Sequence, residues 1–185
     1  MRSYDCLEKQ IFEVDGFTLI PIRDEDKMAI LEMRNEQIFH LRQAEILTIE
    51  NQQKYFNTVI AKLFNQEQPD QILFSVLKDN MFIGYGGLVH INWIDKNAEI
   101  SFIMKTELEK DNFSSYWHLY LSLLEEIAFR DLGFHKIFTY AFDLRPHLYD
   151  VLEVMGFKKE ATLKEHCLFN GKYIDVLIHS KINHV

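Results

Sequence analysis

The sequence is poor in residues that interrupt or cross-link a chain, with three prolines, seven glycines and two cysteines in 185 residues. So little proline and glycine argues against long linkers or disordered segments. Cys6 and Cys167 lie far apart and have neither metal-ligand nor disulfide spacing, which fits a reducing cytoplasm. We therefore expect one domain, residues 1–185, with no metal site and with residues 1–15 as an N-terminal lead-in.

An excess of positive charge and long apolar runs are also lacking. The formal net charge is -8 without a basic patch, which argues against nucleic acid as a partner. No stretch approaches the length of a membrane span, and charges interrupt the first fourteen residues, so neither membrane insertion nor a secretory signal is expected. Hydrophobic residues make up 48%, including fifteen Phe and eight Tyr, and they predict an aromatic-rich core.

Hydrophobic periodicity and turn residues predict the order of elements. The expected elements are a strand at 17–22, a helix from Asp24 through Met33, a helix after Thr48, a hairpin of 72–78 and 81–91, a strand at 97–104, a polar turn at 105–112, a long helix from Phe113, a strand at 136–142, a short helix at 145–154, and final strands at 157–163 and 173–182. This order predicts an α+β fold with a mixed, mainly antiparallel central sheet flanked by helices.

The rest of the predicted fold is organised around residues 97–129. Residues 97–104 alternate in polarity, and apolar residues recur at helical spacing after Phe113. A strand that leads through a polar loop to a helix N-terminus can bind an anion, because free backbone N–H groups and the helix dipole point at it. The simpler alternative is a strand–helix unit with its core face marked.

Three sequence runs resemble the GNAT family of acetyl-CoA-dependent N-acetyltransferases, and the resemblance covers about residues 17–182. They are 31–35 (LEMRN) with 48–56, then 83–88 (IGYGGL) with 91–93 and 98–102, and finally 152–157 (LEVMGF) with Glu160, Leu163 and 170–175 (NGKYID). The first run is similar to enzymes that acetylate nucleotide-linked amino sugars. The third is similar to the ending shared by ribosomal-protein and sugar acetyltransferases. The resemblance therefore implies a GNAT-like fold, in the amino-sugar and ribosomal-protein branch.

The resemblance implies acetyl-CoA as co-substrate and a backbone N–H that stabilises the oxyanion. On the matching strand, the residues expected at the pantetheine arm are Phe102, Ile103 and Met104. The pyrophosphate is expected at Lys110, Asp111, Asn112, Phe113, Ser114 and Ser115. This segment lacks both glycines of the family loop, and Asp111 adds negative charge there. Arg145 is expected to pair with a CoA phosphate.

Four residues are candidates for proton transfer. Glu99 is the first candidate for the general base, and the alternative is a solvent-facing carboxylate paired with a lysine. His90 is the rival base, because its ordinary pKa suits the task; the alternative is a half-exposed strand histidine. Leu152 stands where the family often has a tyrosine that protonates the leaving thiolate, so we consider the nearby Tyr149 as the acid, with His147 as the alternative.

Five residues are candidates for binding the acceptor: Arg34, Asn35, His40, Arg42 and Tyr85. Arg34 can hold a diphosphate by bidentate pairing, or it can instead satisfy the last carbonyls of its helix. His40 and Arg42 fall in the loop that follows, where acceptor specificity often resides in this family. Tyr85 can wall an acceptor pocket or belong to the core.

The implied reaction is acetyl transfer from acetyl-CoA to a primary amine of a small molecule, with a nucleotide-linked amino sugar as the first expectation. Protein N-termini and polyamines are alternatives, and the acidic chain suits cationic polyamines. A non-catalytic GNAT-fold binding module is the remaining alternative, since it would also fit the missing loop glycines. Exposed strand edges often pair in this fold, so a homodimer is a further prediction.

Overall fold

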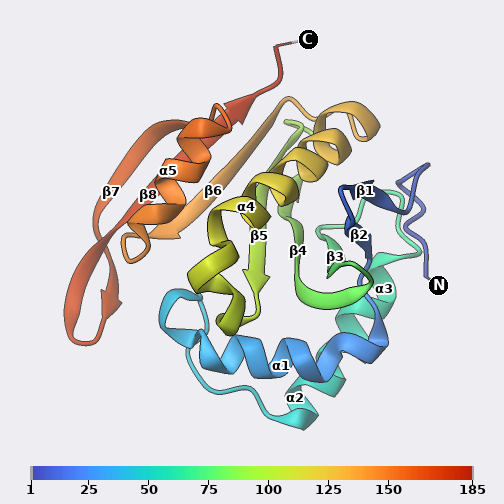
Figure 1. Cartoon of the computed structure of the whole chain (residues 1–185), viewed down its shortest axis with the longest axis horizontal. Helices are drawn as coiled ribbons and strands as arrows, with labels where there is room; N and C mark the ends of the chain where they lie inside the picture. The colour runs from blue at the N-terminus through green and yellow to red at the C-terminus, as the bar shows by residue number, and fades with distance from the viewer. Residues whose placement is uncertain (1, 185) are drawn as a thin grey trace.

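The computed structural model describes residues 2–184 and contains an eight-stranded sheet that helices flank (Figure 1). The strands are β1 (Phe12–Val14), β2 (Phe17–Pro21), β3 (Ile72–Lys78), β4 (Met81–Asn92), β5 (Asn97–Met104), β6 (Lys136–Phe142), β7 (Lys158–Phe169) and β8 (Lys172–Ile182). The α-helices are α1 (Lys27–Glu36), α2 (Ile49–Tyr55), α3 (Ala61–Leu63), α4 (Thr106–Glu125) and α5 (Pro146–Val154). Short 3-10 turns (Asp24–Asp26, Ile38–His40) and wider π-type turns (Phe56–Ile60, Glu126–Asp131) complete the helical segments.

The strand order in the sheet is β1-β2-β3-β4-β5-β6-β8-β7. Every neighbouring pair is antiparallel except β5 and β6, which are parallel. This parallel pairing runs only from Asn97↔Lys136 to Glu99↔Phe138. The sheet confirms the predicted mixed, mainly antiparallel α+β fold, and it leaves the remainder of β5 without a strand partner on its β6 side.

Local turn chemistry sets the hairpins as predicted. Asp79 and Asn80 both adopt positive φ angles, 49° and 67°, as the tight turn between β3 and β4 requires. Asn170 and Gly171 do the same between β7 and β8, with φ angles of 48° and 74°. Thr48 caps α2 in a capping box with Asn51, which explains why the second helix begins there.

The prediction of a polar turn before the long helix is wrong. Residues 105–112 do not form a loop, because α4 begins at Thr106. This segment contains no proline or glycine, and its Glu, Leu and Lys residues favour a helix. Lys110, Asp111, Asn112, Phe113, Ser114 and Ser115 therefore lie within α4. Their N–H groups are directed at carbonyls one turn back, so they do not form an anion-binding cradle.

The helices cover the sheet around the place where β5 and β6 separate. In Figure 1, α4 and α5 lie in front of the sheet, and α1 crosses near the end of β5. Phe102 of β5 stacks on Tyr120 of α4 with ring centroids 4.0 Å apart, and Trp117 contacts both rings edge-on. This aromatic packing fixes α4 against β5. In the described part of the chain, no helix is both long and apolar enough to cross a membrane.

Candidate active site

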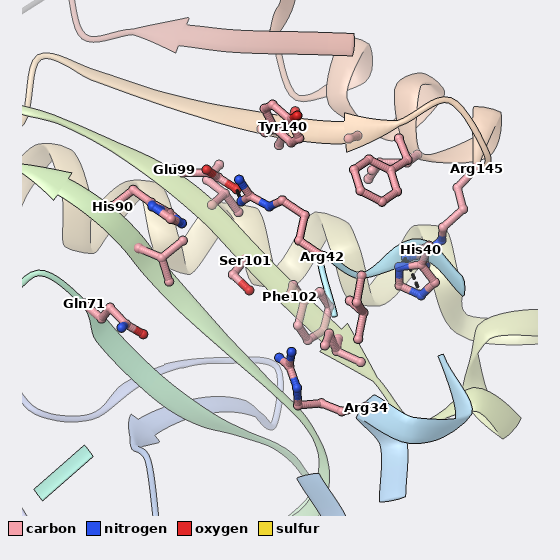
Figure 2. A pocket seen from close by; sticks show the side chains of 18 of the residues that line it. Arg34, His40, Arg42, Gln71, His90, Glu99, Ser101, Phe102, Tyr140 and Arg145 are labelled. Atoms are coloured by element: carbon pink, nitrogen blue, oxygen red, sulfur yellow. Dashed lines mark hydrogen bonds and ion pairs between the residues drawn. The ribbon is translucent and has the colours of Figure 1, made fainter. Parts of the chain in front are cut away.

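A cavity of about 370 Å³ lies where the pairing between β5 and β6 stops (Figure 2). Residues of β5 and β6 form its walls, and Trp117 of α4 also lines it. Residues 40–42, from the segment between α1 and α2, reach into the same space. Several predicted site residues line this cavity: Arg34, His40, Arg42, His90, Glu99, Phe102, Ile103 and Arg145.

Glu99 is the buried carboxylate of this cavity. It is the last β5 residue paired with β6, and only 7% of it is exposed. Burial raises the pKa of Glu99, although the nearby charges of Arg42 and His90 oppose the shift. The alternative of a solvent-facing carboxylate paired with a lysine is therefore not observed, since Glu99 instead pairs with Arg42. A carboxylate with a raised pKa is suited to accept a proton from an amine.

His90 reaches the cavity from a distortion of β4. The pairing of β4 with β5 shifts register between Val89 and Asn92, and His90 adopts a φ of 49°. Bulges and left-handed backbone at non-glycine residues re-aim side chains and are common next to functional sites. In Figure 2, the His90 side chain lies on the Glu99 side of the cavity. His90 therefore remains a candidate for proton transfer, in second place to Glu99.

Tyr140 is a site residue that sequence reasoning missed. It lies on β6, lines the cavity, and has the Arg42 guanidinium 4.5 Å from its ring centroid. Desolvation is the main cause that raises the pKa of its phenol. The sequence places Tyr140 on the predicted strand 136–142. It does not show that this strand pairs with the strand that carries Glu99, so Tyr140 was not predicted as a site residue. Arg42 thus bridges the two strands at the point where they separate.

A second polar cluster lies at the Arg145 end of the cavity. Arg145 donates to Glu109 of α4 at 2.7 Å and to Nδ1 of His40 at 3.3 Å. The opposite ring nitrogen of His40, Nε2, donates to Oε1 of Gln37 at 3.0 Å. Burial, with the positive charge of Arg145, lowers the pKa of His40 to about 3, so the ring is neutral near pH 7. The cluster joins α4 and α5 to the segment after α1.

The backbone of β5 offers hydrogen-bond donors on the cavity side. The Lys105 N–H bonds to the Ile83 carbonyl of β4 at 2.8 Å. Because successive residues of a strand point their backbone groups to opposite sides, Phe102 and Met104 direct theirs away from β4. The Met104 carbonyl accepts a bond there from Nε2 of Gln37 at 2.7 Å. The Phe102 N–H is thereby directed toward the cavity, where the oxyanion donor was predicted.

The cavity is lined by two of the three residues predicted at the pantetheine arm and by none of the predicted phosphate segment. Phe102 and Ile103 line it, and the buried hydroxyl of Thr139, which also lines it, has no hydrogen-bond partner in the described residues. Residues 110–115 do not line it. Phe113 instead packs against His147, with ring centroids 4.3 Å apart. The free N–H groups of α4 belong to its first turn, which carries acidic residues.

Arg34 stands between two cavities. It lines the cavity described above and a second one of about 340 Å³ among residues of α1 and α2, which Tyr85 also lines. Its Nη1 donates to the Tyr85 hydroxyl at 2.6 Å, and its Nε donates to Gln43 at 3.0 Å. These side-chain partners differ from the helix carbonyls of the simpler alternative. Only 7% of Tyr85 is exposed. It lines the second cavity, and its hydroxyl bonds to Arg34, which lines both cavities.

Two further predicted residues, Tyr149 and Asn35, lie outside the lining of both cavities, as do Met104 and residues 110–115. The Tyr149 hydroxyl donates to Asp143 at 3.1 Å, its ring stacks on His179, and its pKa is raised mainly by burial. The structure therefore does not support Tyr149 as the acid. Asn35 exchanges hydrogen bonds with the backbone of Leu47, so it braces the segment between α1 and α2 and lines neither cavity. Among residues 2–184, no group of three or more His, Cys, Asp or Glu is arranged for a metal.

Comparison with known proteins gives a family and several relatives. The model of the acetyltransferase (GNAT) domain matches residues 19–178. Spermidine N(1)-acetyltransferase of Vibrio cholerae serotype O1 is 30% identical over 94 residues, 51% of this chain and 53% of the relative. The match thus spans about half the length of this curated relative. No conclusion about the substrate of this chain follows from a match of that length alone.

Solved structures share the fold. The spermidine N-acetyltransferase from Vibrio cholerae in complex with CoA and spermine has a TM-score of 0.80 at 22% identity, over 91% of this chain and 96% of that one. A dodecameric structure of the same enzyme in an intermediate state has a TM-score of 0.75 at 22% identity, over 91% and 95%. These relatives do not specifically support the amino-sugar and ribosomal-protein branch. The family model, which covers most of the sequence, shows that the chain belongs to the GNAT acetyltransferase family.

Proposed function

We propose that the protein transfers an acetyl group from acetyl-CoA to a primary amine, with Glu99 as the general base. The observation that carries this proposal is a carboxylate with a raised pKa, 7% exposed, that lines a cavity between separating strands. Acetyl-CoA, when bound, supplies the activated acyl carbon. Glu99 accepts a proton from the ammonium, and the Phe102 N–H donates to the negative charge that develops on the carbonyl oxygen.

A polyamine or another alkyl amine is the favoured acceptor. The similarity to spermidine acetyltransferases and the net charge of -8 both support a cationic acceptor. A nucleotide-linked amino sugar requires cations for its diphosphate, yet two of the three arginines that line the cavity are paired with carboxylates. Arg42 pairs with Glu99, Arg145 with Glu109, and Arg34 bonds to Tyr85. The amino-sugar expectation therefore has less support than the polyamine alternative.

The first test is calorimetric titration of the purified protein with acetyl-CoA in the absence of acceptor. Micromolar binding, about -8 kcal/mol, is expected if the cavity holds the pantetheine arm and α4 tolerates the phosphates. A screen of diamines, polyamines, amino-sugar nucleotides and peptide N-termini then follows, with acetylated products identified by mass spectrometry. Undetectable binding would exclude the transferase proposal and favour the non-catalytic module. The oligomeric state is measured on the same samples by light scattering, which tests the predicted homodimer.

A further inference from the structure

We propose that Arg42 occupies the subsite that receives the acceptor ammonium, and that the incoming amine displaces its guanidinium from Glu99 and Tyr140. The inference rests on the proposed function in one respect, namely that the natural ligand of the subsite is the amine that accepts the acetyl group. The binding of a cation at the subsite does not depend on acetyl transfer, so the two can be tested separately.

The subsite presents two features that recognise cations. The Glu99 carboxylate supplies a negative charge from β5, and the Tyr140 ring supplies a π-face from β6, with the Arg42 guanidinium 4.5 Å from its centroid. The Glu99 side chain is 9% exposed, whereas that of Arg42 is 44% exposed. The anion is therefore the inner partner and the cation the outer one. Figure 2 shows the Arg42 guanidinium beside Glu99 and Tyr140. A small cation from solvent can approach by the side from which Arg42 enters.

The Arg42–Glu99 pair competes with the chemistry proposed for Glu99. A guanidinium keeps its protons at all pH values of interest, so it cannot be the group that gives a proton to Glu99. Glu99 Oε1 accepts a hydrogen bond from Arg42, and the positive guanidinium beside it repels an incoming ammonium. His90 is the other basic group that acts on Glu99. Exchange of Arg42 for an alkyl ammonium preserves the local charge and supplies a proton that can be transferred.

The neighbouring contacts allow the Arg42 side chain to leave while its segment stays in place. On one side, His40 is held by Gln37 and by Arg145. On the other, Gln43 bonds to Arg34 and to Asn35. Arg42 is thus a half-exposed side chain between two anchored neighbours. Rotation of its side-chain torsions is sufficient to open the subsite, and no helix or strand has to move.

Binding of butylammonium to the protein without acetyl-CoA tests the subsite directly. Backbone amide NMR titrations compare the wild type with Arg42→Ala and Arg42→Gln, and Arg130→Ala is the matched control because Arg130 is an exposed arginine remote in sequence from the cavity segment. We expect about five- to tenfold tighter binding in both Arg42 variants, with shifts at Glu99 and Tyr140, because removal of a competing occupant raises the fraction of competent protein. The added substitution Glu99→Gln is expected to abolish that binding.

Equal butylammonium affinity in the wild type and in both Arg42 variants would overturn the proposal. So would tight binding that persists when Glu99→Gln is combined with Arg42→Ala. If the protein acetylates amines, Arg42→Ala is also expected to lower the KM for the amine about five- to tenfold and to leave the KM for acetyl-CoA unchanged. A change confined to the KM for acetyl-CoA would instead show that Arg42 blocks the pantetheine arm. If the protein transfers no acetyl group, the proposed function fails, but the NMR titration still decides whether the subsite binds a cation.

Discussion

The substitution Glu99→Gln removes the proposed general base and leaves the shape of the cavity nearly unchanged. Glutamine has nearly the same shape as glutamate, so the half-exposed Arg42 and the ring of Tyr140 keep similar neighbours. Loss of a general base typically lowers kcat by about 10²- to 10⁴-fold, or about 3–5 kcal/mol of barrier. Steady-state rates of CoA release, measured with a thiol reagent, give kcat and KM. Glu13→Gln on β1 is the control, because Glu13 is an exposed carboxylate that lines neither cavity.

The dependence of activity on pH gives a second readout of the same residue. Glu99 must be ionised to act as a base, and burial raises its pKa above the ordinary 4.5. The wild-type kcat/KM is therefore expected to fall as the pH drops through that raised pKa, and this acid limb should vanish in Glu99→Gln. An acid limb that persists unchanged in the variant would assign the base to another group, with His90 as the first candidate.

Stability should change in the direction opposite to activity. A carboxyl whose folded-state pKa is raised stabilises the protein below its unfolded pKa, and this contribution is lost as the pH rises through the folded pKa. Ionised Glu99 is therefore a cost at neutral pH that glutamine does not carry. We expect Glu99→Gln to raise the thermal midpoint more at about pH 8 than at about pH 4. A variant that is less active and also less stable at about pH 8 would refute this account of Glu99.

Three further predictions concern residues that support the cavity. Tyr120→Phe removes the hydroxyl that donates to the Ser101 carbonyl at 2.6 Å, so denaturant unfolding should show a loss of about 1–2 kcal/mol. Gly86→Ala places a Cβ 2.1 Å from the same carbonyl, and the resulting separation of β4 and β5 should lower stability by about 1–3 kcal/mol in the same assay. His40, with a pKa of about 3 beside Arg145, should show no NMR titration between about pH 5 and 8; a midpoint in that range would contradict the cluster.

The lowered pKa of His40 makes the folded protein less stable in acid. Its folded-state pKa lies below the ordinary 6.5, so the unfolded chain takes up a proton that the folded chain does not. Stability from this residue is therefore present above about pH 6.5 and is lost as the pH falls toward about 3. Acid unfolding followed by circular dichroism should thus be shifted to lower pH in His40→Gln. This removes the titrating ring and keeps a polar side chain of similar reach.

Features set by adjacent residues could be predicted from the sequence. Asp79–Asn80 and Asn170–Gly171 tolerate positive φ angles, so their hairpins were evident without tertiary information. The strand 136–142 was predicted with the bounds that the structure shows. Cavity residues from loops and bulges were located in part. Arg42 was a candidate because the resemblance places acceptor binding in its loop, and His90 because the ordinary pKa of histidine suits a base. The short strand β1 lay within the segment predicted as an N-terminal lead-in.

The start of α4 could not be obtained from the family pattern. The high charge of residues 105–112 predicted a polar turn, and the resemblance to GNAT enzymes placed the phosphate loop at residues 110–115. Residues 106–112 contain no glycine or proline to break a helix, and the structure follows this local propensity. Tyr140 was missed for a different reason. Its proximity to Glu99 depends on parallel pairing between strands that are separated by the whole of α4.

The two regions expected to bind substrates match the family resemblance to different degrees. At the Glu99 end of the cavity, a buried carboxylate, a tyrosine ring and the half-exposed Arg42 form the proposed site for a cation. Residues 110–115, which lie outside the cavity lining, are helical where the resemblance places the phosphate loop, and Arg145 is paired with Glu109. Acceptor recognition and CoA recognition can therefore be tested separately. Butylammonium binding reports on the first and acetyl-CoA calorimetry on the second, so a chain that passes only the first test would be an amine-binding protein built on an acetyltransferase fold.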